Sequence, residues 1–289
     1  MKYAYYPGCS LHSTAKEYDV SARLACSDLG IELEELEDWN CCGASAAHNT
    51  DHFLSVAMPA RDLVKAEEQG LDIAAPCAAC YNRLAIAEHE LLNDPETRER
   101  VKKLLGIEYK GKSRAYSLLD IVANKYGVDA LASAIKKPLN GLRAAAYYGC
   151  LLVRPPKVVK FDDPENPLSL DRLVEALGAK AVEWPFKTEC CGASLSITRT
   201  RVVWQLAAQI LTAAQKAGAE AIVVACPFCQ SNLDMRQVQA QKWSGRRWNI
   251  PVYYFTQLLG VALGLPPGEL GLESHFVDPL GVLRQKALV

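Results

Sequence analysis

Apolar residues recur with two different periods along the chain, and the two periods alternate. In the second half, four short apolar or β-branched runs are typical of buried parallel strands, and they cover residues 143–148, 179–184, 219–225 and 251–255. Between the second and third runs, apolar residues return every three to four positions from Val203 to Ala214. This spacing predicts a helix that stops at Gly218.

The first half carries a similar pattern. Apolar residues from Phe53 to Val64 have the helical spacing and end at Gly70, and Pro59 inside this run predicts a kink or a late helix start. Alternation of strands and helices predicts open parallel sheets with right-handed crossovers. We therefore expect an α/β protein of two homologous halves. Each would be a Rossmann-like open parallel sheet with helices on both faces, and pseudo-two-fold symmetry would relate the two.

The boundary between these halves is expected near residues 137–141, where proline, asparagine and glycine interrupt the periodic pattern. This gives an N-terminal cysteine-rich domain at 1–138 and a C-terminal cysteine-rich domain at 139–289. A chain of 289 residues exceeds the usual size of one domain, so two compact units are consistent with its length.

Composition narrows the possible functions. Half of the residues are hydrophobic and 22% are charged, as in ordinary globular proteins. A net charge of -1 gives no electrostatic reason to expect nucleic acid or an anionic membrane as a partner. The N-terminus lacks an apolar secretion core, and no apolar run approaches the roughly 18 residues of a transmembrane segment. We expect a cytoplasmic protein, in which cysteines stay reduced and commonly bind metal or perform redox chemistry.

Ten of the eleven cysteines form two matching sets. In each set a single cysteine precedes an adjacent pair followed by glycine, and 34 residues later comes a pair with two residues between its members. The first set is Cys9, Cys41, Cys42, Cys77 and Cys80, and the second is Cys150, Cys190, Cys191, Cys226 and Cys229. Flanking residues repeat as well, so an internal duplication is the simplest explanation. Cys26 has no counterpart and is predicted to be a small buried core residue.

Each cysteine motif follows a predicted strand. The carboxyl ends of parallel strands line one edge of an open sheet, which is where ligands bind. Five thiols per half should therefore converge at that edge. The helices that begin after these loops would add partial positive charge and favour thiolates.

Several kinds of site could use such a set of thiols. Adjacent cysteines rarely bridge each other, and a reducing compartment disfavours disulfides between distant ones. Zinc commonly takes two Cys-x2-Cys pairs, yet each half has only one such pair and a fifth thiol, so zinc in one site stays open as a minor alternative. A cubane iron–sulfur cluster also needs only four cysteines. The doublet of Cys41 and Cys42, with Gly43 allowing a sharp turn, suits a polynuclear cluster with unusual ligation.

The repeated cysteine pattern resembles that of the B subunit of heterodisulfide reductase and its bacterial or sulfur-oxidation relatives. The resemblance covers nearly the whole chain and extends to residues 161–165, 190–194 and 224–229. It implies that each five-cysteine set binds one noncubane [4Fe-4S] cluster, and that a disulfide is reduced to two thiols between the two clusters. The first cluster would take the first set of cysteines given above, and the second cluster would take the second set.

The resemblance also implies partners. The chain would be the catalytic component, a disulfide oxidoreductase, of a heterodisulfide-reductase-like complex acting on a small disulfide or thiol. No Gly-x-Gly-x-x-Gly fingerprint is present, so electrons are expected from a ferredoxin-like iron–sulfur subunit and a flavoprotein subunit of the same complex. Two alternatives stay open: an electron-transfer or structural iron–sulfur subunit of a quinone-linked dehydrogenase complex, and oxidative action on a sulfur carrier in a sulfur-oxidising complex.

Thiol products require protons, and two histidines lie close after first-set cysteines. His12 and His48 are candidate proton donors because histidine titrates near neutrality, although surface histidines without such a role are commoner. Several cations near the second set could meet an anionic substrate or the charge of a cluster, although solvated surface charge is the default. These cations are Arg154, Lys187, Arg199 and Arg201.

Overall fold

The computed structural model describes residues 1–289 and contains two four-stranded sheets in which all neighbouring strands are parallel. The first sheet has the order β2-β1-β3-β4, with β1 (Lys2–Tyr5), β2 (Glu32–Glu35), β3 (Ile73–Ala75) and β4 (Ala115–Ser117). The second has the order β6-β5-β7-β8, with β5 (Arg143–Tyr147), β6 (Lys180–Ala181), β7 (Ala221–Val224) and β8 (Val252–Tyr254). Both sheets thus have the same topology.

All four apolar runs expected to form strands in the second half do so, although β6 is only two residues long. The predicted α/β class with one parallel sheet in each half is confirmed, whereas the pseudo-two-fold relation and the boundary at residues 138 and 139 stay predictions.

Helices connect the strands in both halves. The first half contains α1 (Gly8–Leu11), α2 (Lys16–Asp28), α3 (Ala47–Thr50), α4 (His52–Gln69), α5 (Ala78–Asn93), α6 (Pro95–Leu105), α7 (Leu118–Asp120), a π-helix η1 (Ile121–Gly127) and α8 (Val128–Ala134). The second contains α9 (Ser169–Ala176), α10 (Leu195–Thr198), α11 (Thr200–Lys216), α12 (Pro227–Leu233), α13 (Gln237–Ser244), α14 (Phe255–Ala262), the 3-10 turns η2 (Pro267–Glu269) and η3 (Leu272–Ser274), and α15 (Leu280–Gln285). None of these helices combines the length and the apolar character needed to cross a bilayer.

The two helices predicted from apolar spacing are α4 and α11. Asp51 caps the start of α4 by accepting a hydrogen bond from the backbone N–H of Leu54, so the helix begins well before Pro59 and the expected late start is wrong. Each helix ends next to a glycine in the left-handed region, Gly70 at φ 69° and Gly218 at φ 77°.

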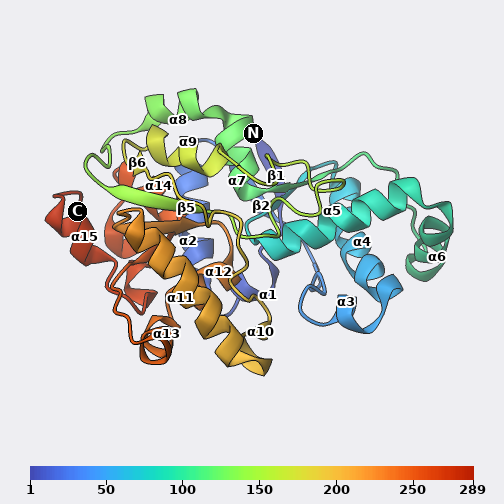
Figure 1. The fold of residues 1–289 in the computed structure, drawn as a ribbon. Coiled ribbons are helices and arrows are strands. Elements are labelled where there is room, and N and C mark those ends of the chain that lie inside the picture. Colours follow the sequence, from blue (N-terminus) through green and yellow to red (C-terminus); the bar gives the residue numbers. More distant parts are fainter.

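The two sheets share one apolar core of 89 buried residues. Helix α2 of the first half packs along α14 of the second, and it lies behind the second-half strands in Figure 1. At this contact the ring of Tyr18 stacks on Tyr254 with ring centroids 4.0 Å apart and planes only 9° from parallel. Cys26, also on α2, is fully buried, as predicted. Helices α3 to α6 extend to the opposite end of the molecule (Figure 1).

Candidate functional site

The strand ends deliver the cysteines to the site. Cys77 follows β3 and caps the start of α5, and Cys226 follows β7 and caps the start of α12. Cys9 lies in α1 directly after β1, and Cys150 lies in the turn after β5. The two doublets lie in loops that follow β2 and β6. All ten cysteines therefore come after the carboxyl ends of parallel strands, as the sequence predicted.

The doublet loops are held in the same way in both halves. The hydroxyl of Tyr6 donates a hydrogen bond to the carbonyl oxygen of Asn40 at 2.6 Å, and the hydroxyl of Tyr147 donates to that of Glu189 at 2.6 Å. Each acceptor is the residue immediately before a doublet. These tyrosines are buried core residues, as expected, and they also fix where each doublet loop begins.

The glycine after each doublet makes the turn that the sequence predicted. Gly43 has φ 74° and Gly192 has φ 92°, both in the left-handed region that favours glycine. The backbone N–H of Gly43 points at the Sγ of Cys41 at 3.4 Å, and that of Gly192 points at the Sγ of Cys190 at 3.3 Å. The first thiol of each doublet thus receives a backbone donor that would stabilise it as a thiolate.

A second pair of glycines provides space for sulfur. A Cβ added at Gly8 would lie 3.0 Å from the Sγ of Cys80, and one added at Gly149 would lie 3.1 Å from the Sγ of Cys229. Both glycines also have positive φ, 69° and 65°. Because any larger residue would press on the thiol and strain the backbone, these positions require glycine.

The thiols contact one another across the whole site. The Sγ atoms of Cys42 and Cys80 are 3.4 Å apart, and those of Cys191 and Cys229 are 3.6 Å apart. Further thiol hydrogen bonds complete a chain that runs through Cys9, Cys41, Cys42, Cys80, Cys77, Cys226, Cys229 and Cys191, with Cys150 and Cys190 paired beside it. The link between Cys77 and Cys226 joins the first quintet to the second.

Charge is unevenly distributed along this chain of thiols. Hydrogen bonds with Cys42 and Cys9 lower the pKa of the Cys41 thiol, and a hydrogen bond with Cys150 lowers the pKa of Cys190 to about 6. The donating thiols respond in the opposite direction, so the pKa values of Cys9 and Cys150 are raised. In each half, the first member of the doublet is therefore a thiol that readily becomes a thiolate.

These residues fit an iron–sulfur group. None of the cysteines forms a disulfide, and six of the ten site thiols are buried. Four thiols of the second quintet, together with Ala78, Tyr148 and Phe228, line a small apolar cavity. Thiolates in such surroundings need a cationic partner, and soft thiolate ligands favour iron–sulfur clusters or zinc. No group of three or more His, Cys, Asp or Glu side chains has the arrangement expected around a single metal ion, and zinc in one site stays the minor alternative.

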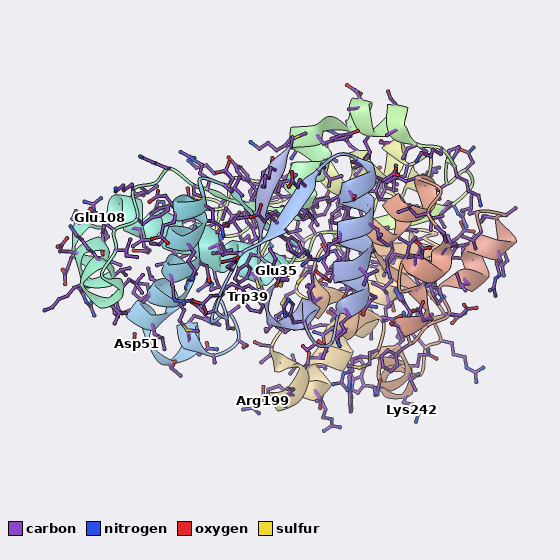
Figure 2. All side chains as sticks on the ribbon, turned by 180° about the vertical axis from the view of Figure 1, so that it is seen from behind. Glu35, Trp39, Asp51, Glu108, Arg199 and Lys242 are labelled. Carbon is purple, nitrogen blue, oxygen red and sulfur yellow. The ribbon has the colours of Figure 1, made fainter.

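The rim of the first quintet is polar. His12, at the end of α1, lies with its Nε2 3.1 Å from Oε1 of Glu35, and its ring meets that of Trp39 edge-on at 5.0 Å. Trp39 also donates to Glu35 at 3.3 Å, and Figure 2 shows these two side chains next to each other. His48 lies exposed on α3 without a hydrogen-bonded partner. Their role as proton donors stays a prediction.

A buried ion pair lies behind the second quintet. Lys187 Nζ is 2.8 Å from Asp171, whose other oxygen accepts a hydrogen bond from the Tyr148 hydroxyl at 2.7 Å. The carbonyl of Lys187 in turn accepts from the backbone N–H groups of Tyr148 and Gly149, at 2.9 and 3.1 Å. Lys187 is therefore a structural residue, which corrects the expectation that it could meet an anionic substrate. Spacing could not reveal this pair because Asp171 lies on another element, α9.

The other cations near the second set lie at the surface. Arg154 pairs with Glu165 at 3.2 Å and donates to the carbonyl of Thr188 at 3.1 Å. Arg199 and Arg201 are exposed and form no ion pair, and Arg199 lies at the outer edge of the molecule in Figure 2.

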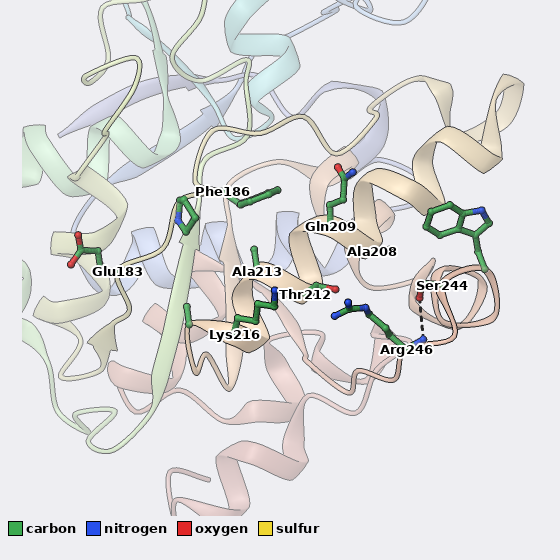
Figure 3. Close-up of a pocket in the computed structure, with 12 residues that line it drawn as sticks. Glu183, Phe186, Ala208, Gln209, Thr212, Ala213, Lys216, Ser244 and Arg246 are labelled. Atoms are coloured by element: carbon green, nitrogen blue, oxygen red, sulfur yellow. Dashed lines mark hydrogen bonds between the residues drawn. The ribbon is translucent and has the colours of Figure 1, made fainter.

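A groove of about 650 Å³ lies elsewhere, between α11, α13 and residues 183–186. Phe186, Ala213 and Trp243 contribute apolar surface, and Lys216 and Arg246 lie at its edge (Figure 3). None of the ten site cysteines lines it, so this groove is separate from the chain of thiols.

Comparison with known proteins identifies the family. The model of the CCG cysteine-rich domain matches residues 3–85 and again residues 144–234, once in each half. The chain is 33% identical to the B subunit of the ferredoxin/F(420)H(2)-dependent CoB-CoM heterodisulfide reductase of Methanosarcina acetivorans, over 98% of this chain and 96% of that one. The chain belongs to the heterodisulfide reductase B-subunit family. The family resemblance predicted from the cysteine pattern is thereby confirmed.

Other relatives of this B-subunit family member differ in their names. The chain is 36% identical to the 8-methylmenaquinol:fumarate reductase membrane anchor subunit of Wolinella succinogenes, over 96% of this chain and 97% of that protein. It is 31% identical to a protein of Archaeoglobus profundus that is named as similar to the heterodisulfide reductase B subunit, over 93% of each chain. The crystal structure of a hypothetical protein from Helicobacter pylori matches with a TM-score of 0.78 at 17% identity, over 96% of this chain and 52% of that one. At this identity, the likeness supports the fold alone.

Proposed function

We propose that this chain is the catalytic subunit of a heterodisulfide-reductase-like complex and that it reduces a small disulfide to two thiols. Family membership supports redox chemistry in a multi-subunit complex. The contact between Cys77 and Cys226 carries the proposal furthest, because it brings the two cysteine sets together where one substrate could meet both.

The ligand assignment follows the two quintets. Cys9, Cys41, Cys42, Cys77 and Cys80 would hold one noncubane [4Fe-4S] cluster, and Cys150, Cys190, Cys191, Cys226 and Cys229 would hold the other. When bound, the two clusters supply one electron each and iron sites that stabilise thiolate charge. The protein contributes the backbone donors of Gly43 and Gly192 and the tyrosine anchors of the doublet loops, which orient these sulfur atoms before substrate arrives.

Electrons and protons must both be supplied. The reaction adds two electrons and two protons to one sulfur–sulfur bond and releases two thiols. A cytoplasmic complex with a ferredoxin-like iron–sulfur subunit and a flavoprotein subunit would provide the electrons. We assign proton delivery to His12 and His48. His12 has the stronger case, because its contact with Glu35 would favour the protonated ring.

Metal analysis on anaerobically purified protein tests the cofactor. We expect about eight iron atoms and as many sulfides per chain, as two four-iron clusters require. Cys42→Ser and Cys191→Ser should each remove about half of the iron, whereas Cys26→Ala, a change at a buried cysteine outside both quintets, should keep all of it. One zinc ion per chain in place of iron would refute the cluster assignment.

Catalysis is tested with a reduced viologen dye and a panel of small disulfides, by counting thiols released per dye oxidised. Two dye electrons should yield two thiols, and each doublet variant should abolish turnover. Full iron content without thiol release from any disulfide would refute the catalytic role. The same assay with an oxidised dye and thiols tests the reverse direction, which action on a sulfur carrier would use.

A second candidate is an electron-transfer subunit of a quinone-linked complex. The relative from Wolinella succinogenes favours it, because its name assigns that protein to a menaquinol-dependent reductase. A small disulfide should perturb the electron paramagnetic resonance signals of a catalytic subunit and leave those of a pure relay unchanged. The relay would instead pass electrons to a soluble quinone analogue.

A further inference from the structure

The two quintets differ in charge at one equivalent helix position. Arg83 lies on α5 three residues after Cys80, and Asn232 lies on α12 three residues after Cys229. The flanking sequence repeats around these positions, with leucine following each of them. One half thus carries a permanent cation where the other carries a neutral amide.

Arg83 is held beside the first quintet. Its guanidinium is half-buried and donates to the side-chain oxygen of Asn82 at 3.1 Å. Asn82 is itself anchored to the second half by donating to the carbonyl oxygens of Leu151 and Arg154 at 3.0 and 2.7 Å. No carboxylate lies within ion-pair distance of Arg83, and the negative group that acts on it is the Cys42 thiolate. A half-buried cation without a carboxylate favours negative charge at the thiols.

Asn232 occupies the corresponding place in the second quintet. It is fully buried, and its amide donates to the carbonyl oxygens of Cys191 and Ala193 at 3.1 and 3.3 Å and approaches the Cys191 Sγ at 3.7 Å. The nearest arginine on this segment of the chain, Arg236, donates to the carbonyl of Ser196. The second quintet therefore receives amide dipoles at this position and no full positive charge.

Neighbouring acids add to the difference. Glu189 precedes the second doublet, and its negative charge acts on Cys190. Asn40 precedes the first doublet, where the closest acid is Asp62, a buried carboxyl that accepts from the Asn40 N–H at 2.9 Å. Burial raises the pKa of Asp62 to about 7, so it carries only part of a charge at neutral pH. The first quintet is therefore the more electropositive of the two.

We propose that the first quintet holds the more easily reduced of the two clusters, and that Arg83 sets this order. The inference rests on the proposed function, because it requires both clusters. Reduction adds one negative charge to a cluster, and a half-buried cation beside its ligands lowers the free energy of that charge. The first cluster would then fill first and hold the electron until the second arrives, so a disulfide would meet an ordered pair of donors.

Potentiometric titration followed by electron paramagnetic resonance tests this order. The signals are assigned with Cys42→Ser and Cys191→Ser, which each remove one cluster. Arg83→Gln should shift the electron distribution away from the first cluster by about tenfold, which is about 59 mV for a one-electron couple. Arg83→Lys, which keeps the charge, should retain most of the original potential. Asn232→Arg should raise the potential of the second cluster and narrow the gap.

The outcomes separate the two proposals. Unchanged potentials in both Arg83→Gln and Asn232→Arg, with full iron content, would overturn the role of Arg83 and leave the cluster assignment intact. A wild-type chain without iron would overturn both proposals. If Arg83→Gln fails to load the first cluster, Asn232→Arg decides alone, because its second cluster must then titrate at a higher potential than in the wild type.

Discussion

The two halves of the molecule share their backbone and differ in what surrounds their sulfur atoms. Strand order, tyrosine anchors, doublet turns and the close glycines are the same in both. The first quintet has Arg83 beside it and a polar rim containing His12 and Glu35. The second has Asn232 in contact with its thiols and the buried pair of Lys187 and Asp171 behind it.

This difference separates two requirements. Holding five thiols in one place depends on the backbone, since the same turns and glycines occur twice. Setting the electrostatic environment depends on side chains that a duplicated copy is free to change. Two sites with one backbone but unlike surroundings can hold the same kind of group at unlike potentials.

The largest effect should come from the glycines that make room for sulfur. Gly8→Ala should empty the first quintet of iron and Gly149→Ala the second, because each added Cβ meets a thiol within 3.1 Å. Gly70→Ala and Gly245→Ala are matched controls. Both have positive φ but open space, so they should cost only about 1 kcal/mol of unfolding free energy and keep their iron. Equal iron loss in Gly70→Ala would show that backbone strain alone explains the result.

The next effect is confined to the second half. Lys187→Met should lower the free energy of unfolding by about 3–5 kcal/mol, because it leaves the Asp171 carboxylate buried without its cation. Lys136→Met removes the cation of an exposed pair with Asp28 and should cost less than about 1 kcal/mol. Denaturant unfolding of both variants measures the difference. A further Asp171→Leu change should restore much of the stability lost in Lys187→Met.

The halves should also respond to pH in opposite directions. Burial raises the pKa of Asp62 to about 7, so its contribution to stability is full below about pH 4 and is lost as pH rises through 7. Burial lowers the pKa of His275 to about 4, so its contribution is full above about pH 6.5 and is lost as pH falls toward 4. Each contribution is about 3 kcal/mol at most.

Thermal unfolding between about pH 4.5 and 8.5 tests this contrast, since the range spans most of both transitions. Asp62→Asn should flatten only the alkaline side of the stability curve, and His275→Gln only the acidic side. A variant that flattens the side assigned to the other would contradict the assignment.

The smallest effect should be equal in the two halves. Tyr6→Phe and Tyr147→Phe each leave one buried carbonyl, that of Asn40 or of Glu189, without its hydroxyl donor. Each should lower the free energy of unfolding by about 1 kcal/mol. A clear inequality between the two, measured by denaturant unfolding, would show that the doublet loops are not held alike.

Much of the fold and the candidate ligand set could be predicted from the sequence. Apolar periodicity is a local property, so it located α4, α11 and the second-half strands. Cysteine spacing located both quintets because the duplication repeats nearly the same intervals. The expected late start at Pro59 was wrong because the Asp51 cap begins α4 before the proline.

Contacts between distant parts of the chain were beyond this reasoning. The meeting of Cys77 with Cys226 depends on how the two sheets pack together, which no local pattern encodes. The pairing of Lys187 with Asp171 joins a loop to α9, and Arg83 approaches Cys42 from another element. Each of these depends on tertiary packing.

The shared apolar core has a consequence for how such a chain can change over time. A duplicated gene usually frees one copy to drift, but here a substitution on α2 alters the surface that α14 must match, and the stacked rings of Tyr18 and Tyr254 leave little tolerance. The copies are thus bound to evolve in step where they touch. Divergence is left to the helix positions that face the sulfur atoms.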